Sequence, residues 1–191
     1  MSATYKENEN FNGGNFTRED FIHEEYENCS FTGCDFSEAN LSTIKFYECR
    51  FIDCNLSLAI LVNTLFREVN FSGCKMLGLK FENCRQATSS LSFERCNLSH
   101  ASFYQANGKK TIFKNCMLLE VDFVNADFSG ASFDESDLSG AVFENTILIK
   151  TDFSSAFNYT INPGVNRVKK AKFSLPGLPG LLAQYDLDIV G

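Results

Sequence analysis

The chain has 191 residues, of which 44% are apolar and 21% are charged, and its formal net charge is −7. These values suit one globular domain and do not suit a disordered chain. The longest apolar stretch, residues 56–62, is too short to span a bilayer, and residues 1–10 are polar rather than a signal sequence. We therefore expect a cytoplasmic protein that contacts no membrane.

Internal repetition is the strongest signal in the chain. An apolar residue, most often phenylalanine, recurs at every fifth position from Phe11 to Phe81 and again from Phe93 to Phe153, with Gly108 as the one exception. Five helical steps rotate by about 140°, and an odd step along a strand reverses the side chain, so neither element keeps these residues on one face. If the backbone turns a corner after each five residues, they all point inward. The pattern predicts an all-β solenoid with an aromatic core.

The repeat units resemble those of a known family. Ala126-Asp127-Phe128-Ser129-Gly130 and Ser136-Asp137-Leu138-Ser139-Gly140 are similar to pentapeptide repeats, whose pattern is small, polar, Leu or Phe, then two variable positions. The resemblance implies a right-handed quadrilateral β-helix with four repeats, or twenty residues, in each coil. Some eight coils at the spacing of paired strands would make a rod roughly 40 Å long.

The repeat also sets the expected organisation of the chain. We expect an N-terminal extension over residues 1–10, the β-helix over residues 11–175 and a C-terminal cap and dimerisation module over residues 176–191. Twelve residues instead of ten separate Phe81 from Phe93, which predicts a two-residue bulge or kink near residues 83–90. Gly108 brings no core side chain, so we expect it to loosen one corner.

The eight cysteines allow two interpretations. They stand two residues before an apolar repeat position, where sister repeats carry alanine, valine or threonine, so a small buried hydrophobe accounts for them. The alternative is metal or redox use, because twenty-residue coils would stack Cys29 on Cys49, Cys34 on Cys54, Cys54 on Cys74 and Cys96 on Cys116. Cytosolic thiols stay reduced, which favours the first interpretation.

The sequence offers little for catalysis. The two histidines, His23 and His100, are expected on different faces and several coils apart, so no acid–base pair or triad follows. No nucleotide-binding glycine loop and no cluster of metal-binding histidines is present in the sequence. We therefore expect no enzyme, no cofactor and no metal site.

Acidic residues gather near the C-terminal end of the repeats. Between residues 120 and 152 the only base is Lys150, and this stretch supplies the whole net charge of −7. Such a negative band would repel nucleic acid and attract basic grooves, although it could also serve solubility alone. The candidate acidic surface consists of Glu120, Asp122, Asp127, Asp134, Glu135, Asp137, Glu144 and Asp152.

A second resemblance narrows the function. Residues 162–175 and 178–191 are similar to the C-terminal module of one branch of the family. That branch protects DNA gyrase and topoisomerase IV from quinolones, microcin B or albicidin. The units that begin at Cys54, Cys74 and Leu91 look closest to the albicidin-resistance members. The resemblance implies a rod-shaped homodimer whose acidic surface mimics DNA. The short insertion departs from quinolone-protecting relatives with longer loops, which favours a loop-poor relative.

The chain after Pro176 is expected to close the open end of the solenoid, which would otherwise expose unpaired strand edges. A short helix around residues 178–185 would cover the last coil, and a strand-like apolar tail would follow. Tail-to-tail homodimerisation is implied by the resemblance, and folding back on the same rod is the alternative. The candidate cap and interface residues are Leu178, Leu181, Leu182, Tyr185, Leu187, Ile189 and Val190.

Outward-facing aliphatic residues admit two explanations, a partner surface or packing against one another along the stack; they are Leu58, Ile60, Val62, Leu65, Val142, Ile147 and Ile149. The sequence as a whole predicts a DNA-mimicking protein that binds a type II topoisomerase. The alternative is a generic pentapeptide-repeat scaffold that binds another protein.

Overall fold

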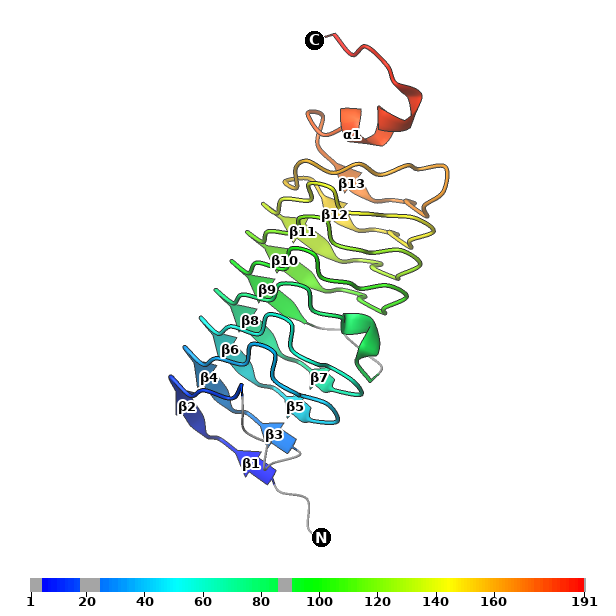
Figure 1. Cartoon of the computed structure of the whole chain (residues 1–191). Helices are drawn as coiled ribbons and strands as arrows, with labels where there is room; N and C mark the ends of the chain where they lie inside the picture. Colours follow the sequence, from blue (N-terminus) through cyan, green and yellow to red (C-terminus); the bar gives the residue numbers. More distant parts are fainter. Residues whose placement is uncertain (1–4, 18–24, 86–90, 191) are drawn as a thin grey trace.

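The computed structural model describes residues 5–17, 25–85 and 91–190. Within them the chain winds into a parallel β-solenoid of stacked coils, with β1 near one end of the rod and the short helix α1 at the other (Figure 1). This confirms the all-β solenoid that the repeat predicts and the right-handed quadrilateral β-helix that the family resemblance implies.

The strands form two parallel sheets. The smaller has the order β1 (Tyr5–Glu7), β3 (Glu25–Glu27), β5 (Lys45–Tyr47) and β7 (Leu65–Arg67). The larger has the order β2 (Asn10–Asn12), β4 (Ser30–Thr32), β6 (Arg50–Ile52), β8 (Asn70–Ser72), β9 (Ser92–Glu94), β10 (Ile112–Lys114), β11 (Ser132–Asp134), β12 (Asp152–Phe153) and β13 (Lys172–Phe173). Because β1 pairs with β3, the ladder reaches into residues 1–10, which the sequence assigned to an extension.

The register repeats at twenty residues. Phe11 pairs with Phe31 and Phe113 with Phe133, whereas Phe71 pairs with Phe93, a step of twenty-two. The longer step leaves two extra residues between these paired strands. We number the four faces of a coil by their central inward residues, so that face 1 is centred on Phe113, face 2 on Leu118, face 3 on Phe123 and face 4 on Phe128. The larger sheet is face 1 and the smaller sheet is the N-terminal part of face 4.

An aromatic stack fills the core behind face 1. Nine phenylalanine rings lie one above another, with neighbouring centroids 4.8–5.3 Å apart and ring planes within 19° of parallel; they are Phe11, Phe31, Phe51, Phe71, Phe93, Phe113, Phe133, Phe153 and Phe173. Rings from the other faces meet this stack edge-on, as Phe103 meets Phe113 at 83°. Each coil thus buries large apolar side chains at the spacing of its backbone ladder.

Left-handed backbone turns the corners. The second residue after the central inward residue usually has a positive φ, for example 53° at Glu120, 59° at Asn125 and 70° at Gly130. This conformation suits glycine and asparagine and costs other residues roughly 1–2 kcal/mol. Glutamate and lysine also occupy it here, so the ladder hydrogen bonds and core packing outweigh that cost and present charged side chains at the corners.

The insertion leaves face 1 undisturbed. A short 3₁₀ turn, η1 (Phe81–Asn83), begins the inserted region, and residues 86–90 of the expected bulge lie outside the described part of the chain. The rings of Phe71 and Phe93 stack across it at 5.2 Å and 7°. The phenylalanine stack is therefore continuous between the coils that flank the insertion.

The expectation that Gly108 loosens a corner is wrong. The Phe128 ring from the next coil lies against Gly108, where an added Cβ would come closer than 3.0 Å to three atoms of that ring. Rings on neighbouring faces usually meet edge-on, but Phe128 is tilted by only 37° relative to Phe113 and 45° relative to Phe133, so it departs from the regular arrangement. The neighbouring aromatic side chain fills the space that the glycine leaves.

The C-terminal end carries the expected helix, formed by α1 (Pro179–Leu182) and the 3₁₀ turn η2 (Ala183–Tyr185). The amide of Ile161 donates to the carbonyl of Gly180 at 3.0 Å, and Leu181 packs on the core, so this segment is fastened to the last coil. Residues 186–190 have no regular secondary structure, unlike the strand-like tail expected from the sequence. Among the described residues, no helix has the length and apolar character needed to cross a membrane.

Candidate acidic interaction surface

Aspartate has a local structural role in these repeats. At the position before the central inward residue, its Oδ1 accepts the backbone amide two residues later, as in Asp122 to Val124 at 2.8 Å and Asp137 to Ser139 at 3.1 Å. Asn97 makes the same turn with Ser99 at 3.0 Å. Because asparagine and aspartate serve this turn equally, the turn explains the residue size but not the charge. The choice of a carboxylate here needs another reason.

The coil register separates the eight candidate acids. Glu120 and Asp122 lie at the corner between faces 2 and 3, and Asp137 and Glu144 lie on the same two faces one coil higher. Asp134 and Glu135 stand at the adjoining corner of face 1, where Asp134 ends β11. We call these six residues the acidic side: Glu120, Asp122, Asp134, Glu135, Asp137 and Glu144.

Faces 2 and 3 carry no lysine or arginine over the C-terminal coils. Their residues in this part, 96–105, 116–125, 136–145 and 156–165, include four acids and no lysine or arginine. His100 is the one basic side chain there, and its Nδ1 lies 3.3 Å from Glu120 Oε2. The four carboxylates of the acidic side that lie on faces 2 and 3 therefore have little opposing charge beside them, whereas Asp134 on face 1 has Lys114 as its register partner.

Hydrogen bonds keep part of the acidic side ionised. Partial burial by itself would raise the pKa of Asp137, but hydrogen bonds from Ser139 and Asn158 outweigh it and lower that pKa. Asp134 Oδ1 accepts a hydrogen bond from the hydroxyl of Ser155 at 2.7 Å. These donors are neutral, so they orient the carboxylates and leave the negative charge in place.

The other two acids are paired with lysines. Asp127 lies on face 4, where its Oδ2 is 3.2 Å from Lys109 Nζ, and Asp152 on face 1 is 2.7 Å from Lys172 Nζ. The hydrogen bond from Lys172, followed by that from Ser154, lowers the pKa of Asp152 to about 2. Asp127 and Asp152 thus stay ionised but contribute little net charge.

Face 4 is basic, which sequence reasoning missed. Its C-terminal residues, 106–110, 126–130, 146–150 and 166–170, hold six bases and one acid. Lys110, Gly130, Lys150 and Lys170 follow one another up a single corner, and the position of a Cβ on Gly130 lies 3.8 Å from Lys110 Cγ. The spacing of these lysines, forty residues from Lys110 to Lys150 and twenty from Lys150 to Lys170, is a multiple of the coil length and was the signal that could have revealed it. The predicted negative band is therefore interrupted by face 4.

The C-terminal end exposes apolar side chains. Only Leu181 of the predicted cap and interface residues packs on the core. The other six are exposed, from 37% at Leu182 to 92% at Val190; they are Leu178, Leu182, Tyr185, Leu187, Ile189 and Val190. The chain therefore does not fold these residues back onto its own rod.

The outward aliphatic residues divide into two groups. Leu65, Ile147 and Ile149 are half-buried along the stack, which supports packing between coils. Val142 and the group of Leu58, Ile60 and Val62 are exposed, and Leu77 of the next coil lies above that group, where its carbonyl accepts the Leu58 amide at 2.9 Å. A contiguous apolar patch thus occupies the corner of faces 2 and 3 in the N-terminal half.

The architecture defines a protein class before any relative is considered: a parallel β-solenoid built from five-residue repeats. A family model described as a pentapeptide repeat region matches residues 24–103, and one described as pentapeptide repeats (8 copies) matches residues 92–130 and 126–157. Together they cover more than half of the chain, which therefore belongs to the pentapeptide-repeat family. No curated protein matches it significantly.

Two solved structures are similar in fold. A trypsin-treated form of QnrB1, a plasmid-mediated fluoroquinolone resistance protein, aligns with a TM-score of 0.63 and 20% identity over 99% of this chain and 100% of that chain. HetL, a pentapeptide repeat protein involved in heterocyst differentiation regulation from the cyanobacterium Nostoc sp., aligns with a TM-score of 0.50 and 22% identity over 90% of this chain and 84% of that chain. At these identities the similarity concerns the fold alone.

Proposed function

We propose that this protein binds a type II topoisomerase, DNA gyrase or topoisomerase IV, through its acidic side and protects it from a poison by occupying its DNA-binding groove. No chemistry by the protein is required. The QnrB1 role in fluoroquinolone resistance agrees with this proposal, and the sequence resemblance to albicidin-resistance members makes albicidin the first poison to test.

The observation that carries the proposal is charge density. The six carboxylates of the acidic side fall within two successive coils, whose stacked rings are 5.0 Å apart for Phe113 and Phe133 and 4.8 Å apart for Phe123 and Phe143. Double-stranded DNA carries one charge per roughly 1.7 Å of axis, or about six charges over the roughly 10 Å that two coils span. A groove that binds phosphates would meet a similar number of negative charges on this side of the rod.

Two rods would offer a longer acidic surface than one. The exposed apolar residues at the C-terminal end, among them Leu187, Ile189 and Val190, would be buried if two copies joined end to end. The homodimer is therefore part of the proposal. Light scattering of the protein and of a Leu187→Asp/Ile189→Asp variant tests it: we expect the mass of a dimer for the first and of a monomer for the second.

The functional test is supercoiling by purified gyrase, titrated with this protein with and without albicidin or a quinolone at two salt concentrations. We expect salt-sensitive inhibition of the free enzyme or rescue of the poisoned one. The variant Glu120→Gln/Asp122→Asn/Asp137→Asn/Glu144→Gln should lose both effects while keeping the aspartate turns. The matched control Asp127→Asn/Asp152→Asn removes lysine-paired acids and should keep most activity. Equal behaviour of the two variants would refute the acidic side as the binding surface.

A protein-binding scaffold without a topoisomerase role is the second candidate function. The exposed patch of Leu58, Ile60, Val62 and Leu77 favours it, because such a patch suits contact with an apolar partner surface. Absence of any effect on gyrase and topoisomerase IV, combined with loss of a cellular partner in an Ile60→Asp variant, would select this candidate.

A further inference from the structure

Five buried cysteines form a single column through the middle of the rod. Cys34, Cys54, Cys74, Cys96 and Cys116 occupy the same inward position of face 2 in five successive coils, and each is at most 2% exposed. The sequence showed pairs, whereas the register joins them into one unbroken run, which we call the thiol column. Gly14 precedes it and Ser136 follows it at the same position. Cys29 and Cys49 make a separate pair on face 1.

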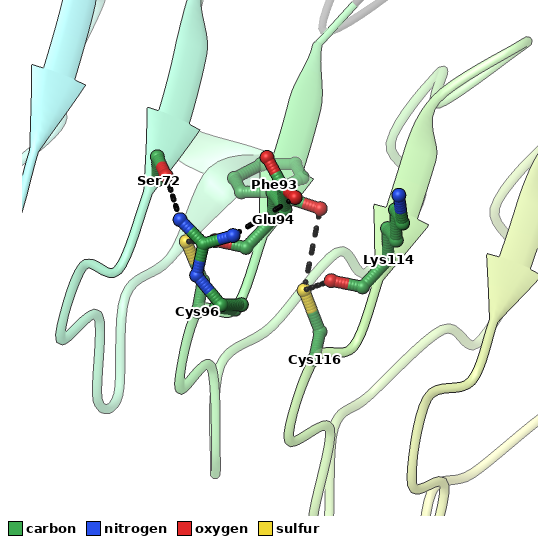
Figure 2. Close-up of polar contacts among 7 residues, drawn as sticks. Ser72, Phe93, Glu94, Cys96, Lys114 and Cys116 are labelled. Atoms are coloured by element: carbon green, nitrogen blue, oxygen red, sulfur yellow. Dashed lines mark hydrogen bonds and ion pairs between the residues drawn. The ribbon is translucent and has the colours of Figure 1, made fainter.

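The thiols of the column share one orientation. Cys54 Sγ lies 3.3 Å from the Phe31 carbonyl and 3.4 Å from the Ile52 carbonyl. Cys116 Sγ lies 3.4 Å from the carbonyls of Phe93 and Lys114, as Figure 2 shows beside Cys96. Since the same contacts recur from coil to coil, neighbouring sulfur atoms are separated by about one coil. The phenylalanine stack gives that spacing as 4.8–5.2 Å over these coils.

This spacing disfavours disulfides. A disulfide needs Cβ atoms about 3.5–4.5 Å apart and sulfur atoms about 2.05 Å apart, whereas side chains stacked in parallel register keep roughly the strand spacing of 4.8 Å. Joining two neighbours would require the coils to approach by several tenths of an ångström against packed phenylalanines. A Zn–thiolate bond is about 2.3 Å long. With bonds of about that length, an ion midway between two thiolates requires a sulfur–sulfur distance of about 4.6 Å, which small side-chain adjustments can reach from the spacing of the column.

We propose that the thiol column binds Cu(I), with one ion held in line between the thiolates of two successive coils. Thiolates select soft ions such as Cu(I). The column offers ligands in pairs, and nowhere in the described residues, the column included, do three or more metal-binding side chains converge, so the fitting ion is one that accepts two ligands. The same geometry holds for Cys29 and Cys49, which adds one further site.

Binding requires no change of oxidation state. For each ion two S–H bonds break, two Cu–S bonds form, two protons leave to solvent and copper remains Cu(I), which gives a bridge of charge −1. Because each site releases protons when it fills, the affinity should rise with pH. Because a sulfur bridging two ions in one straight line would have unfavourable bond angles, we expect alternate gaps to fill.

The alternate filling gives a parity rule. Five thiols in a row supply two separate pairs, and they still do so when Cys34, Cys74 or Cys116 is removed. Removing Cys54 or Cys96 isolates one thiol and leaves only one pair. Together with the Cys29–Cys49 pair, the intact protein should hold three ions, Cys74→Ala three, and Cys54→Ala two. Alanine occupies the same position at Ala156, so it is compatible with the fold.

Because the column is closed to solvent in the folded state, the experiment refolds the full chain from urea in the presence of copper. Oxygen is excluded, and Cu(I) is supplied from a chromophoric Cu(I) chelator. Copper per chain is measured after desalting, and circular dichroism confirms that each variant folds. We expect three ions for the protein and for Cys84→Ser, whose thiol lies outside the column. Retention of no copper, or equal loss for Cys54→Ala and Cys74→Ala, would overturn the proposal. Neighbouring thiols found oxidised in the refolded protein would instead establish disulfides.

Discussion

The acidic side and face 4 are built from the same repeat, at the same coil spacing, over the same C-terminal coils, yet they carry opposite charge. Four acids and no lysine or arginine occupy the C-terminal parts of faces 2 and 3, whereas six bases and one acid occupy face 4. The backbone does not distinguish them, since both use the same corners and inward positions. In a solenoid, the position of a charged residue within its twenty-residue coil decides which face of the rod it joins.

The difference shows why net charge is an incomplete guide to the partner of this protein. The charge of −7 suggests a uniformly acidic body, but the rod has one side that suits a phosphate-binding groove and one that such a groove would repel. Binding should therefore depend on orientation as well as on charge. The proposed topoisomerase contact can use only one side of the rod at a time.

Charge reversal should give the largest effect on this comparison. We expect Asp122→Lys/Glu144→Lys to weaken gyrase binding more than tenfold, because attraction becomes repulsion at the centre of the acidic side. Reversal on face 4, Lys150→Glu/Lys170→Glu, should change binding less than twofold or strengthen it. Surface plasmon resonance with immobilised gyrase measures both. A greater loss of binding from the face 4 variant would show that gyrase contacts face 4 rather than the acidic side.

Salt dependence should give the next largest effect. If six carboxylates meet basic groups, the affinity should fall steeply between 50 mM and 200 mM salt, as it does for proteins that make about six phosphate contacts. Neutralising Glu120, Asp122, Asp137 and Glu144 should flatten this dependence. Neutralising the lysine-paired Asp127 and Asp152 should leave the slope nearly unchanged, and an unchanged slope in both variants would argue against electrostatic binding.

A stability test addresses the interior behind face 4. Gly108→Ala should destabilise the protein by about 1–3 kcal/mol, because its Cβ would overlap the Phe128 ring in a packed core. Gly130→Asn is the control on the same face: its φ is +70° and an added Cβ would meet only Lys110 Cγ at 3.8 Å. We expect a change within about 0.5 kcal/mol there. Urea unfolding measures both, and a neutral Gly108→Ala would contradict the filled corner.

The smallest effect concerns Asp152. Its pKa in the folded protein is about 2, below the usual 3.8 of an aspartate, so its contribution to stability is present above about pH 4 and is lost as the pH falls towards 2. The stability difference between the protein and Asp152→Asn should therefore shrink over that range. Lys172→Gln should reduce this pH dependence in the same way. Urea midpoints from pH 5 to pH 2 test it, and a constant difference would exclude the ion pair as the cause.

Several features could be predicted from the sequence because they repeat. The five-residue period fixes which side chains point inward, and the longer step from Phe81 to Phe93 agrees with the twenty-two-residue step between the paired Phe71 and Phe93. The helix after Pro176 was also predictable from the spacing of its leucines. The Gly108 expectation failed because a glycine in the pattern gives no information on whether a neighbouring ring, here Phe128, can lean into its place.

The sequence by itself determined the solenoid, its inward residues and the number of charges it carries, because a short period constrains every unit alike. Only the tertiary structure decided which charges share a surface: it pairs Asp127 with Lys109 and Asp152 with Lys172, and it aligns five cysteines in one column. Within the part of the chain that the structure describes, Glu144 on the acidic side forms no ion pair with a lysine or arginine. The physical reason is that these contacts join residues about twenty positions apart, and their neighbours are set by the coil length and by the two-residue step rather than by local sequence.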